Sequence, residues 1–117
     1  WSTLSDRAAK TSFTPIQPGA ILEKVVALPI QTWSYQGQLE PARHLGPVAQ
    51  DFHAAFGLGG DSRRINTVYA DGVALAAIQG LHEMVREKSE RIAALEARNA
   101  ELLQRLEALA QRLPPAP

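Results

Sequence analysis

Residues 71–113 read DGVALAAIQGLHEMVREKSERIAALEARNAELLQRLEALAQRL, and this stretch decides the fold. Apolar residues recur alternately three and four positions apart, which is the heptad pattern of a coiled coil. One helix cannot bury such a stripe alone, so the pattern predicts association of identical helices, each roughly 60 Å long. The predicted seam consists of Ile78, Leu81, Val85, Ile92, Leu95, Asn99, Leu102, Leu106, Leu109 and Leu113.

Charged residues beside the seam favour parallel helices. Every g position from residue 91 onward is arginine, and in an antiparallel pair these charges would face one another. In a parallel bundle Arg91 can meet Glu96 of the neighbouring helix instead. Within one helix, two glutamate–arginine pairs four residues apart add support. These pairs are Glu87 with Arg91 and Glu101 with Arg105.

The number of helices is less clearly specified by the heptads. Most a positions are β-branched or leucine, most d positions are leucine, and Asn99 at an a position is typical of a residue that sets the register. By this rule alone the pattern favours two strands. Lys88 occupies a d position and weakens the first half of the seam.

About 70 residues precede the long helix, and we expect them to form a small α+β head, so that the whole chain is mainly helical. Three parts are predicted: a head over 1–70, a coiled-coil helix over 71–113 with Asp71 as its N-cap, and a disordered proline-rich tail over 114–117. Since the chain begins at Trp1 without an initiator methionine, we expect it to be a piece of a longer polypeptide. Periodicity and proline positions predict helices over 20–28 and 49–56 and strands over 30–35 and 43–48.

Composition argues against several functions. Twelve basic and twelve acidic residues give zero formal net charge, which argues against non-specific nucleic-acid binding. There is no cysteine, and no apolar run approaches the ~20 residues of a membrane span. The three histidines lie at no metal-ligand spacing, and the glycine-rich loop over 57–60 lacks the Lys-Ser/Thr of a phosphate loop. We therefore predict no metal, no cofactor, and no nucleic-acid or membrane partner.

Ser5 and Lys10 are the residues that suggest nucleophilic chemistry. A serine hydroxyl can attack a peptide carbonyl when a nearby amine accepts its proton. A lysine can do so only when burial lowers its pKa toward neutrality. A spacing of five places the two side chains on different faces of a regular helix or strand, so only a bent segment brings them together.

Four patches of sequence, taken together, resemble one family. They come in the family's order, and the resemblance covers nearly everything from Ser5 to the long helix. The chain is similar to the peptidase S74 domain, the intramolecular chaperone of endosialidase. Two departures are Ala9, where the family often has a larger aliphatic residue, and Ala8, where it often has a basic one. The patches are SDRAAK over 5–10, LPIQTWSY over 28–35, RHLGPVAQDF over 43–52 and DGVALAAIQGL over 71–81.

The resemblance implies a function. In that family the domain lies at the C-terminus of phage tail fibres and tailspikes, of bacterial surface proteins and of transcription factors of the myelin regulatory factor type. It trimerises, helps the upstream passenger to fold, and then cuts itself off beside the serine of a Ser-Asp-x-x-x-Lys motif; with the parallel orientation inferred above, this implies a parallel trimeric coiled coil. By this resemblance Ser5 is the nucleophile, Lys10 is the general base, the scissile bond is adjacent to Ser5, and three helices are favoured over two.

Two alternatives belong to other classes of function. The first is a trimerisation or interaction module of a phage or bacterial surface protein without catalysis, which predicts trimers and no processing. The second is a ligand-binding head that uses Trp33, Tyr35 and His44, which predicts an open aromatic pocket.

Overall fold

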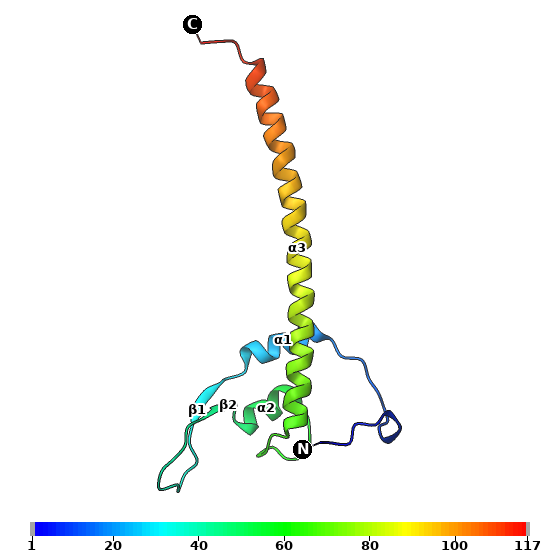
Figure 1. Ribbon diagram of the computed structural model, residues 1–117, viewed down its shortest axis with the longest axis vertical. Helices are drawn as coiled ribbons and strands as arrows, with labels where there is room; N and C mark the ends of the chain where they lie inside the picture. Colours follow the sequence, from blue (N-terminus) through cyan, green and yellow to red (C-terminus); the bar gives the residue numbers. More distant parts are fainter. Residues whose placement is uncertain (1, 117) are drawn as a thin grey trace. The chain divides into compact units, whose positions relative to one another are not determined.

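The computed structural model describes residues 2–116; Trp1 of the predicted head and Pro117 of the predicted tail lie outside the described residues. The fold is mainly helical, with a small two-stranded sheet and a long C-terminal helix, as predicted. The chain divides into two compact units, an N-terminal unit that ends at Gly80 and a C-terminal unit that begins at Leu81. Along the chain the elements are η1 (Arg7–Ala9), α1 (Pro18–Ala27), β1 (Gln31–Trp33), β2 (His44–Gly46), α2 (Ala49–Phe56) and α3 (Thr67–Arg112), most of which are labelled in Figure 1.

The first α-helix is bounded by two prolines. Pro18 occupies its first turn, where the missing N–H removes no helical hydrogen bond. The helix ends at Ala27, because Leu28 precedes Pro29 and has the extended backbone that this position favours. The helix predicted over 20–28 is thereby confirmed, two residues earlier at its start.

The two strands form one short antiparallel pair. Their register places Thr32 opposite Leu45, with Gln31 opposite Gly46 and Trp33 opposite His44. Each strand has three residues instead of the six predicted. The second strand stops before Pro47, which has no N–H to donate to the sheet.

The second helix, α2, has the predicted bounds of 49–56. It ends at Gly57, whose φ of 62° is left-handed and whose N–H donates to the carbonyl of His53 at 2.8 Å. Glycine adopts this conformation without the steric cost of a side chain, so the loop that follows is set by one residue. Phe52 is buried and packs against Phe56, with the two rings tilted by 53° and their centroids 4.9 Å apart.

The long helix α3 has 46 residues and begins at Thr67, so the prediction of Asp71 as its N-cap was wrong. Asn66 precedes the first turn, and its side-chain oxygen accepts from the N–H of Val68 at 2.9 Å. Asparagine and aspartate cap helices about equally well. Asn66 can therefore cap the helix as well as Asp71 could. A helix that starts at Thr67 also has the additional backbone hydrogen bonds of the turn from Thr67 to Ala70.

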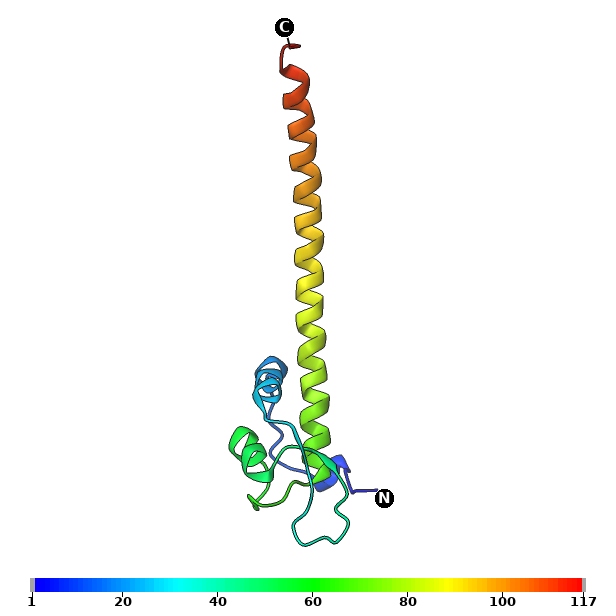
Figure 2. The same cartoon turned by 90° about the vertical axis from the view of Figure 1, so that its left-hand side faces the viewer.

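The N-terminal unit has a small core between helices. Among the described residues, the buried apolar side chains are Phe52, Val73, Ala76 and Ala77. Gly80 of α3 is also buried, and a Cβ at this position would overlap the carbonyl group of Pro18 at the start of α1. The absence of a side chain at Gly80 thus permits α1 to approach the backbone of α3 closely (Figure 2).

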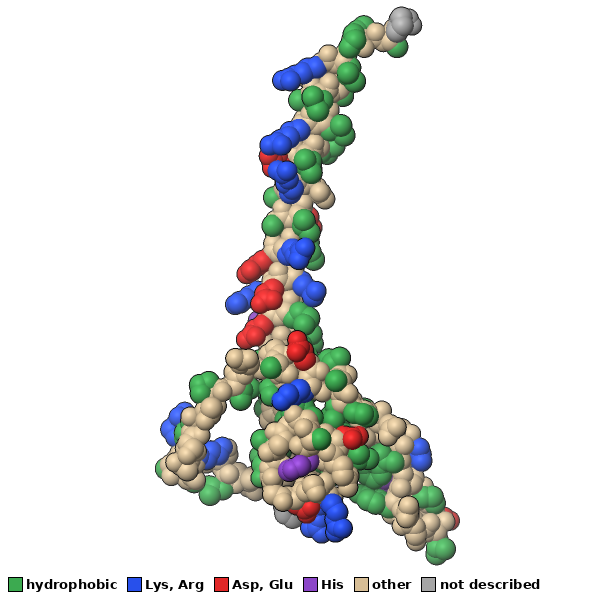
Figure 3. Space-filling model, turned by 180° about the vertical axis from the view of Figure 1, so that it is seen from behind, with side chains coloured by type: hydrophobic (Ala, Val, Ile, Leu, Met, Phe, Trp, Pro, Cys, Tyr) green, Lys and Arg blue, Asp and Glu red, His purple; other side chains and the backbone are tan. Residues whose placement is uncertain are grey.

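The C-terminal unit consists of the rest of α3 and the residues that follow it. Every described residue from Leu81 onward is exposed, although the unit is rich in leucine. Figure 3 shows hydrophobic side chains running along the helix beside charged ones. The apolar side chains of the predicted seam are between 45% exposed at Leu102 and 72% exposed at Leu113, so one chain leaves its apolar stripe uncovered.

Candidate functional site

Ser5 and Lys10 lie in direct contact. The Lys10 amine donates a hydrogen bond to the Ser5 hydroxyl, with Nζ and Oγ 2.5 Å apart. A regular helix or strand would separate residues five apart, so the contact requires a bend between them. The sequence had predicted this requirement, and the structure contains the bend.

The bend is a single 3-10 turn, η1, capped by Asp6. The Asp6 carboxylate accepts from the N–H of Ala8 at 2.9 Å. Its backbone carbonyl accepts from the N–H of Ala9 at 3.0 Å, and the Lys10 N–H donates to the carbonyl of Arg7 at 3.2 Å. These three bonds fold the backbone so that residue 10 returns to residue 5. This turn was not predicted from the sequence. The feature that could have indicated it is Asp6, because aspartate is a strong capping residue and can accept a hydrogen bond from the N–H two residues later, here that of Ala8.

A second reversal follows Lys10. Ser12 has a φ of 56°, in the left-handed region that only a few non-glycine residues adopt. Its carbonyl accepts from the Thr14 hydroxyl at 3.2 Å. The chain then passes Arg7, whose guanidinium lies 5.8 Å from the centroid of the Phe13 ring, within the range of a cation–π contact. The segment over 5–14 therefore forms a loop whose contacts are local.

The loop is open to solvent on the single chain. All described residues before Pro18 are exposed, including Ser5 and Lys10. The pair has the distance that proton transfer from hydroxyl to amine requires. Burial of the amine, which a general-base lysine also needs, is not supplied by this chain alone.

The charged residues of α3 pair within the helix. Glu101 contacts Arg105 at 2.7 Å and Arg98 at 3.2 Å. The first of these contacts confirms one of the two predicted pairs. The other, between Glu87 and Arg91, is not among the ion pairs within 4.0 Å in residues 2–116.

Comparison with known protein families identifies the segment that contains this loop. Residues 5–58 match the family model of peptidase S74, described as the chaperone of endosialidase. The segment belongs to the peptidase S74 family. The resemblance inferred from sequence patches is thereby confirmed. The match starts at Ser5, includes both strands and α2, and ends before α3. No curated protein and no solved structure gives a significant match to the chain.

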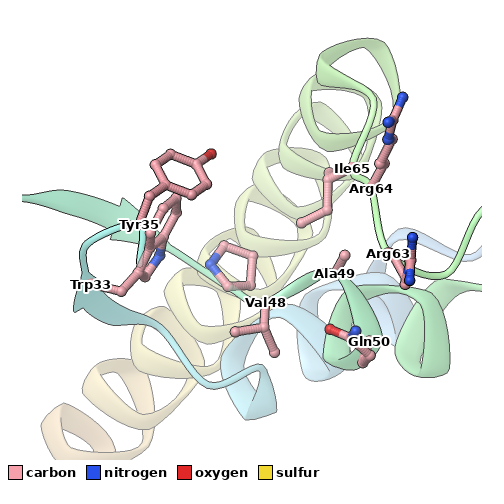
Figure 4. Close-up of a pocket in the computed structure, with 9 residues that line it drawn as sticks. Trp33, Tyr35, Val48, Ala49, Gln50, Arg63, Arg64 and Ile65 are labelled. Atoms are coloured by element: carbon pink, nitrogen blue, oxygen red, sulfur yellow. The ribbon is translucent and has the colours of Figure 1, made fainter. Parts of the chain in front are cut away.

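The S74 segment also provides most of the lining of an open pocket of about 510 Å³. Trp33 and Tyr35 stand on one side of it, and Ile65 lies across from them, whereas Arg64 points away (Figure 4). His44 does not line the pocket; its ring stacks on Trp33 with centroids 4.8 Å apart. Two of the three residues expected to form an aromatic ligand pocket, Trp33 and Tyr35, therefore line this one, and all three rings contact one another.

Within residues 2–116, no group of three histidine, aspartate or glutamate side chains is placed to hold a metal ion. In the same range, none of the helices combines the length and the apolar character that crossing a membrane requires.

Proposed function

We propose that this chain is an intramolecular chaperone that trimerises through α3, assists the folding of an upstream passenger, and releases itself by autoproteolysis at Ser5. The observation that carries the proposal is the contact between the Lys10 amine and the Ser5 hydroxyl at 2.5 Å, at the first residue of a peptidase S74 segment. Membership in the family supports the chaperone role. The exposed apolar stripe of α3 supports self-association.

The proposed cleavage breaks the peptide bond between Leu4 and Ser5. Attack by the Ser5 hydroxyl on the preceding carbonyl closes a five-membered ring, whereas attack on its own carbonyl would close a strained four-membered one. In its neutral form, Lys10 accepts the hydroxyl proton as Oγ bonds to the Leu4 carbonyl carbon. The carbon–nitrogen bond then breaks, and the Ser5 nitrogen takes up a proton. The resulting ester of Leu4 on Ser5 Oγ is hydrolysed by water, which frees the upstream chain.

Assembly would supply the burial that the pair lacks. A lysine amine in water is protonated at neutral pH, with a reference pKa of about 10.4, and so cannot accept a proton. Covering Lys10 with a second chain or with the folded passenger would favour its neutral form. Cleavage would then follow assembly, which is the order that a chaperone requires.

The trimeric seam supplies the folding assistance. A fibre that must align three chains has a slow, entropically costly first step. Parallel association through α3 holds the three chains at high effective concentration and in one stagger. Once the passenger is folded, removal of the chaperone leaves it kinetically trapped in its folded form, because the element that would guide re-association is gone.

The test is a fusion of a folded reporter protein to the N-terminus of the full chain, followed by denaturing gels and intact mass measurement. We expect the wild-type fusion to yield a product that starts at Ser5, and Ser5→Ala and Lys10→Ala to remain uncut. Lys10→Arg is the matched control, because it keeps the charge but cannot act as a base at neutral pH. A wild type that is never cut, or alanine variants cut as fast as wild type, would remove the protease claim.

A non-catalytic trimerisation module is the second candidate. Solvent exposure of both Ser5 and Lys10 favours it, because an exposed lysine is a poor base. This alternative predicts stable trimers by sedimentation equilibrium and no processing, with or without an upstream passenger. The same fusion experiment separates the two, since only the chaperone-protease requires Ser5.

A further inference from the structure

We propose that Asp6 is a positioning residue for the Ser5–Lys10 pair, because its side chain caps the turn that folds Lys10 back onto Ser5. The inference rests on the proposed self-cleavage and adds to it the residue that prepares the reacting pair. Asp6 itself touches neither reacting atom in the hydrogen bonds of the loop.

Sequence distance makes a positioning device necessary. Five residues of extended chain would separate the α-carbons of Ser5 and Lys10 by roughly 16 Å. A continuous α-helix would bring the backbone closer but turn the two side chains to different faces. Only a local reversal lets the amine reach the hydroxyl, and η1 is that reversal.

Asp6 provides two of the three acceptors that hold the reversal. Its backbone carbonyl receives the Ala9 N–H, and its carboxylate receives the Ala8 N–H at 2.9 Å. A turn of three residues has few bonds, and all of them compete with water because the loop is exposed. Removing the side-chain acceptor therefore shifts the loop toward open conformations in which Lys10 leaves Ser5.

The cap acts through geometry and not through its charge. Within residues 2–116, Asp6 forms no ion pair within 4.0 Å, so its carboxylate does not hold the Lys10 amine directly. An asparagine or serine side chain can accept the same backbone N–H without a charge, because both are strong caps. Glutamate keeps the charge but is a poor residue for this position.

The experiment compares cleavage rates of the same reporter fusion in four variants. We expect Asp6→Ala and Asp6→Glu to slow cleavage roughly tenfold, the effect expected from loss of a cap. Asp6→Asn and Asp6→Ser should stay close to the wild-type rate. Asp61→Ala is the matched control: Asp61 accepts from the N–H of Arg63 at 2.9 Å in the same way, but at a turn far from Ser5 in the sequence.

A second measurement separates failure of this inference from failure of the proposed function. Amide hydrogen exchange of Ala8, read by NMR in the Ser5→Ala background, reports the turn without any cleavage. Protection that is lost in Asp6→Ala and kept in Asp6→Asn supports the cap. The inference is overturned if Asp6→Ala cleaves like wild type, if Asp6→Glu outperforms Asp6→Asn, or if Ala8 protection does not change. If wild type is never cut, both the proposed function and a role for Asp6 in cleavage fall, even where the exchange data show a cap.

Discussion

The two units of the molecule use their apolar side chains in opposite ways. In the N-terminal unit, Phe52, Val73, Ala76 and Ala77 are buried within the chain. In the C-terminal unit every described residue is exposed, although the helix is regular over its whole length. One unit therefore has a core and short elements, and the other has a long element and no core. The difference shows that in this protein a regular helix can extend over many residues without a buried core within the same chain.

The helix α3 takes part in both arrangements. In its first turns, Val73 and Ala77 are spaced to lie on one face and are buried, while Ile78 on another face is 63% exposed. Ile78 belongs to the seam predicted from the heptads. Most of the stability of a helix in a protein comes from packing of its apolar face, so we expect the helix beyond Gly80 to be stabilised by the proposed association with other chains.

The largest effect is expected from a charge on the seam. Leu102→Asp would place a carboxylate at a d position of every chain and remove a leucine from the packed layer. We expect a loss of roughly 3 kcal/mol or more per chain, enough to dissociate the assembly at micromolar concentration. Sedimentation velocity and circular dichroism at 222 nm measure the two consequences. Gln104→Asp adds the same charge at an f position and should remain assembled; identical behaviour of the two variants would contradict the seam.

Smaller effects on stability are expected at two glycines of α3, and the two substitutions should change the free energy of unfolding in opposite directions. In Gly80→Ala the new methyl group meets the carbonyl of Pro18, which should destabilise the N-terminal unit by about 1–3 kcal/mol. In Gly72→Ala nothing lies within 4 Å of the new group, so helix propensity alone should stabilise the unit by up to about 1 kcal/mol. Urea unfolding followed by tryptophan fluorescence measures both. Stabilisation by both substitutions would show that α1 does not pack on Gly80.

Asn99 at an a position of the predicted seam should lower the stability of the assembly and at the same time restrict it to one register. Asn99→Ile would remove an amide that the proposed seam buries, and it should stabilise the assembly by about 1–3 kcal/mol per chain, while sedimentation equilibrium should show a mixture of oligomers. Ala100→Ile is the control, because a b position lies outside the seam. A destabilised but still homogeneous Asn99→Ile assembly would mean that Asn99 makes a specific bond that isoleucine cannot replace.

The sequence predicted the long elements better than the short ones. Periodicity is a property of many residues at once, so the heptads specified α3 despite Lys88 and Asn99, and the Phe52–Phe56 spacing with the following Gly57 specified α2. The strands were predicted twice as long as they are, because β-forming residues favour extension, while Pro47 and the lack of further pairing strands limit the ladder.

The candidate site depended on geometry that spacing does not reveal. Ser5 and Lys10 could be chosen from residue chemistry and from the family resemblance. That they meet depends on one capped turn, in which Asp6 decides the conformation of three following residues. Such turns are stabilised by about three hydrogen bonds, so many alternative conformations lie close in free energy. The sequence could therefore state the need for a bend without locating it. The start of α3 is a similar case, because Asn66 and Asp71 are equivalent as caps.

The smallest expected effect on stability concerns the ion pairs that Glu101 forms within the helix of the C-terminal unit. Glu101 pairs with Arg98 and Arg105, and in the described part of this unit these are the ion pairs present. Glu101→Gln should cost about 0.5 kcal/mol at low salt, and the cost should vanish at 1 M salt, where exposed charges are screened. Glu107→Gln removes the same charge from a residue outside these pairs and should be nearly neutral. Thermal melts at both salt concentrations measure the difference; a cost that persists unchanged in 1 M salt would mean that Glu101 also bonds to another chain. If the cost is as small as expected, side-chain ion pairs within one chain contribute little to the stability of this helix.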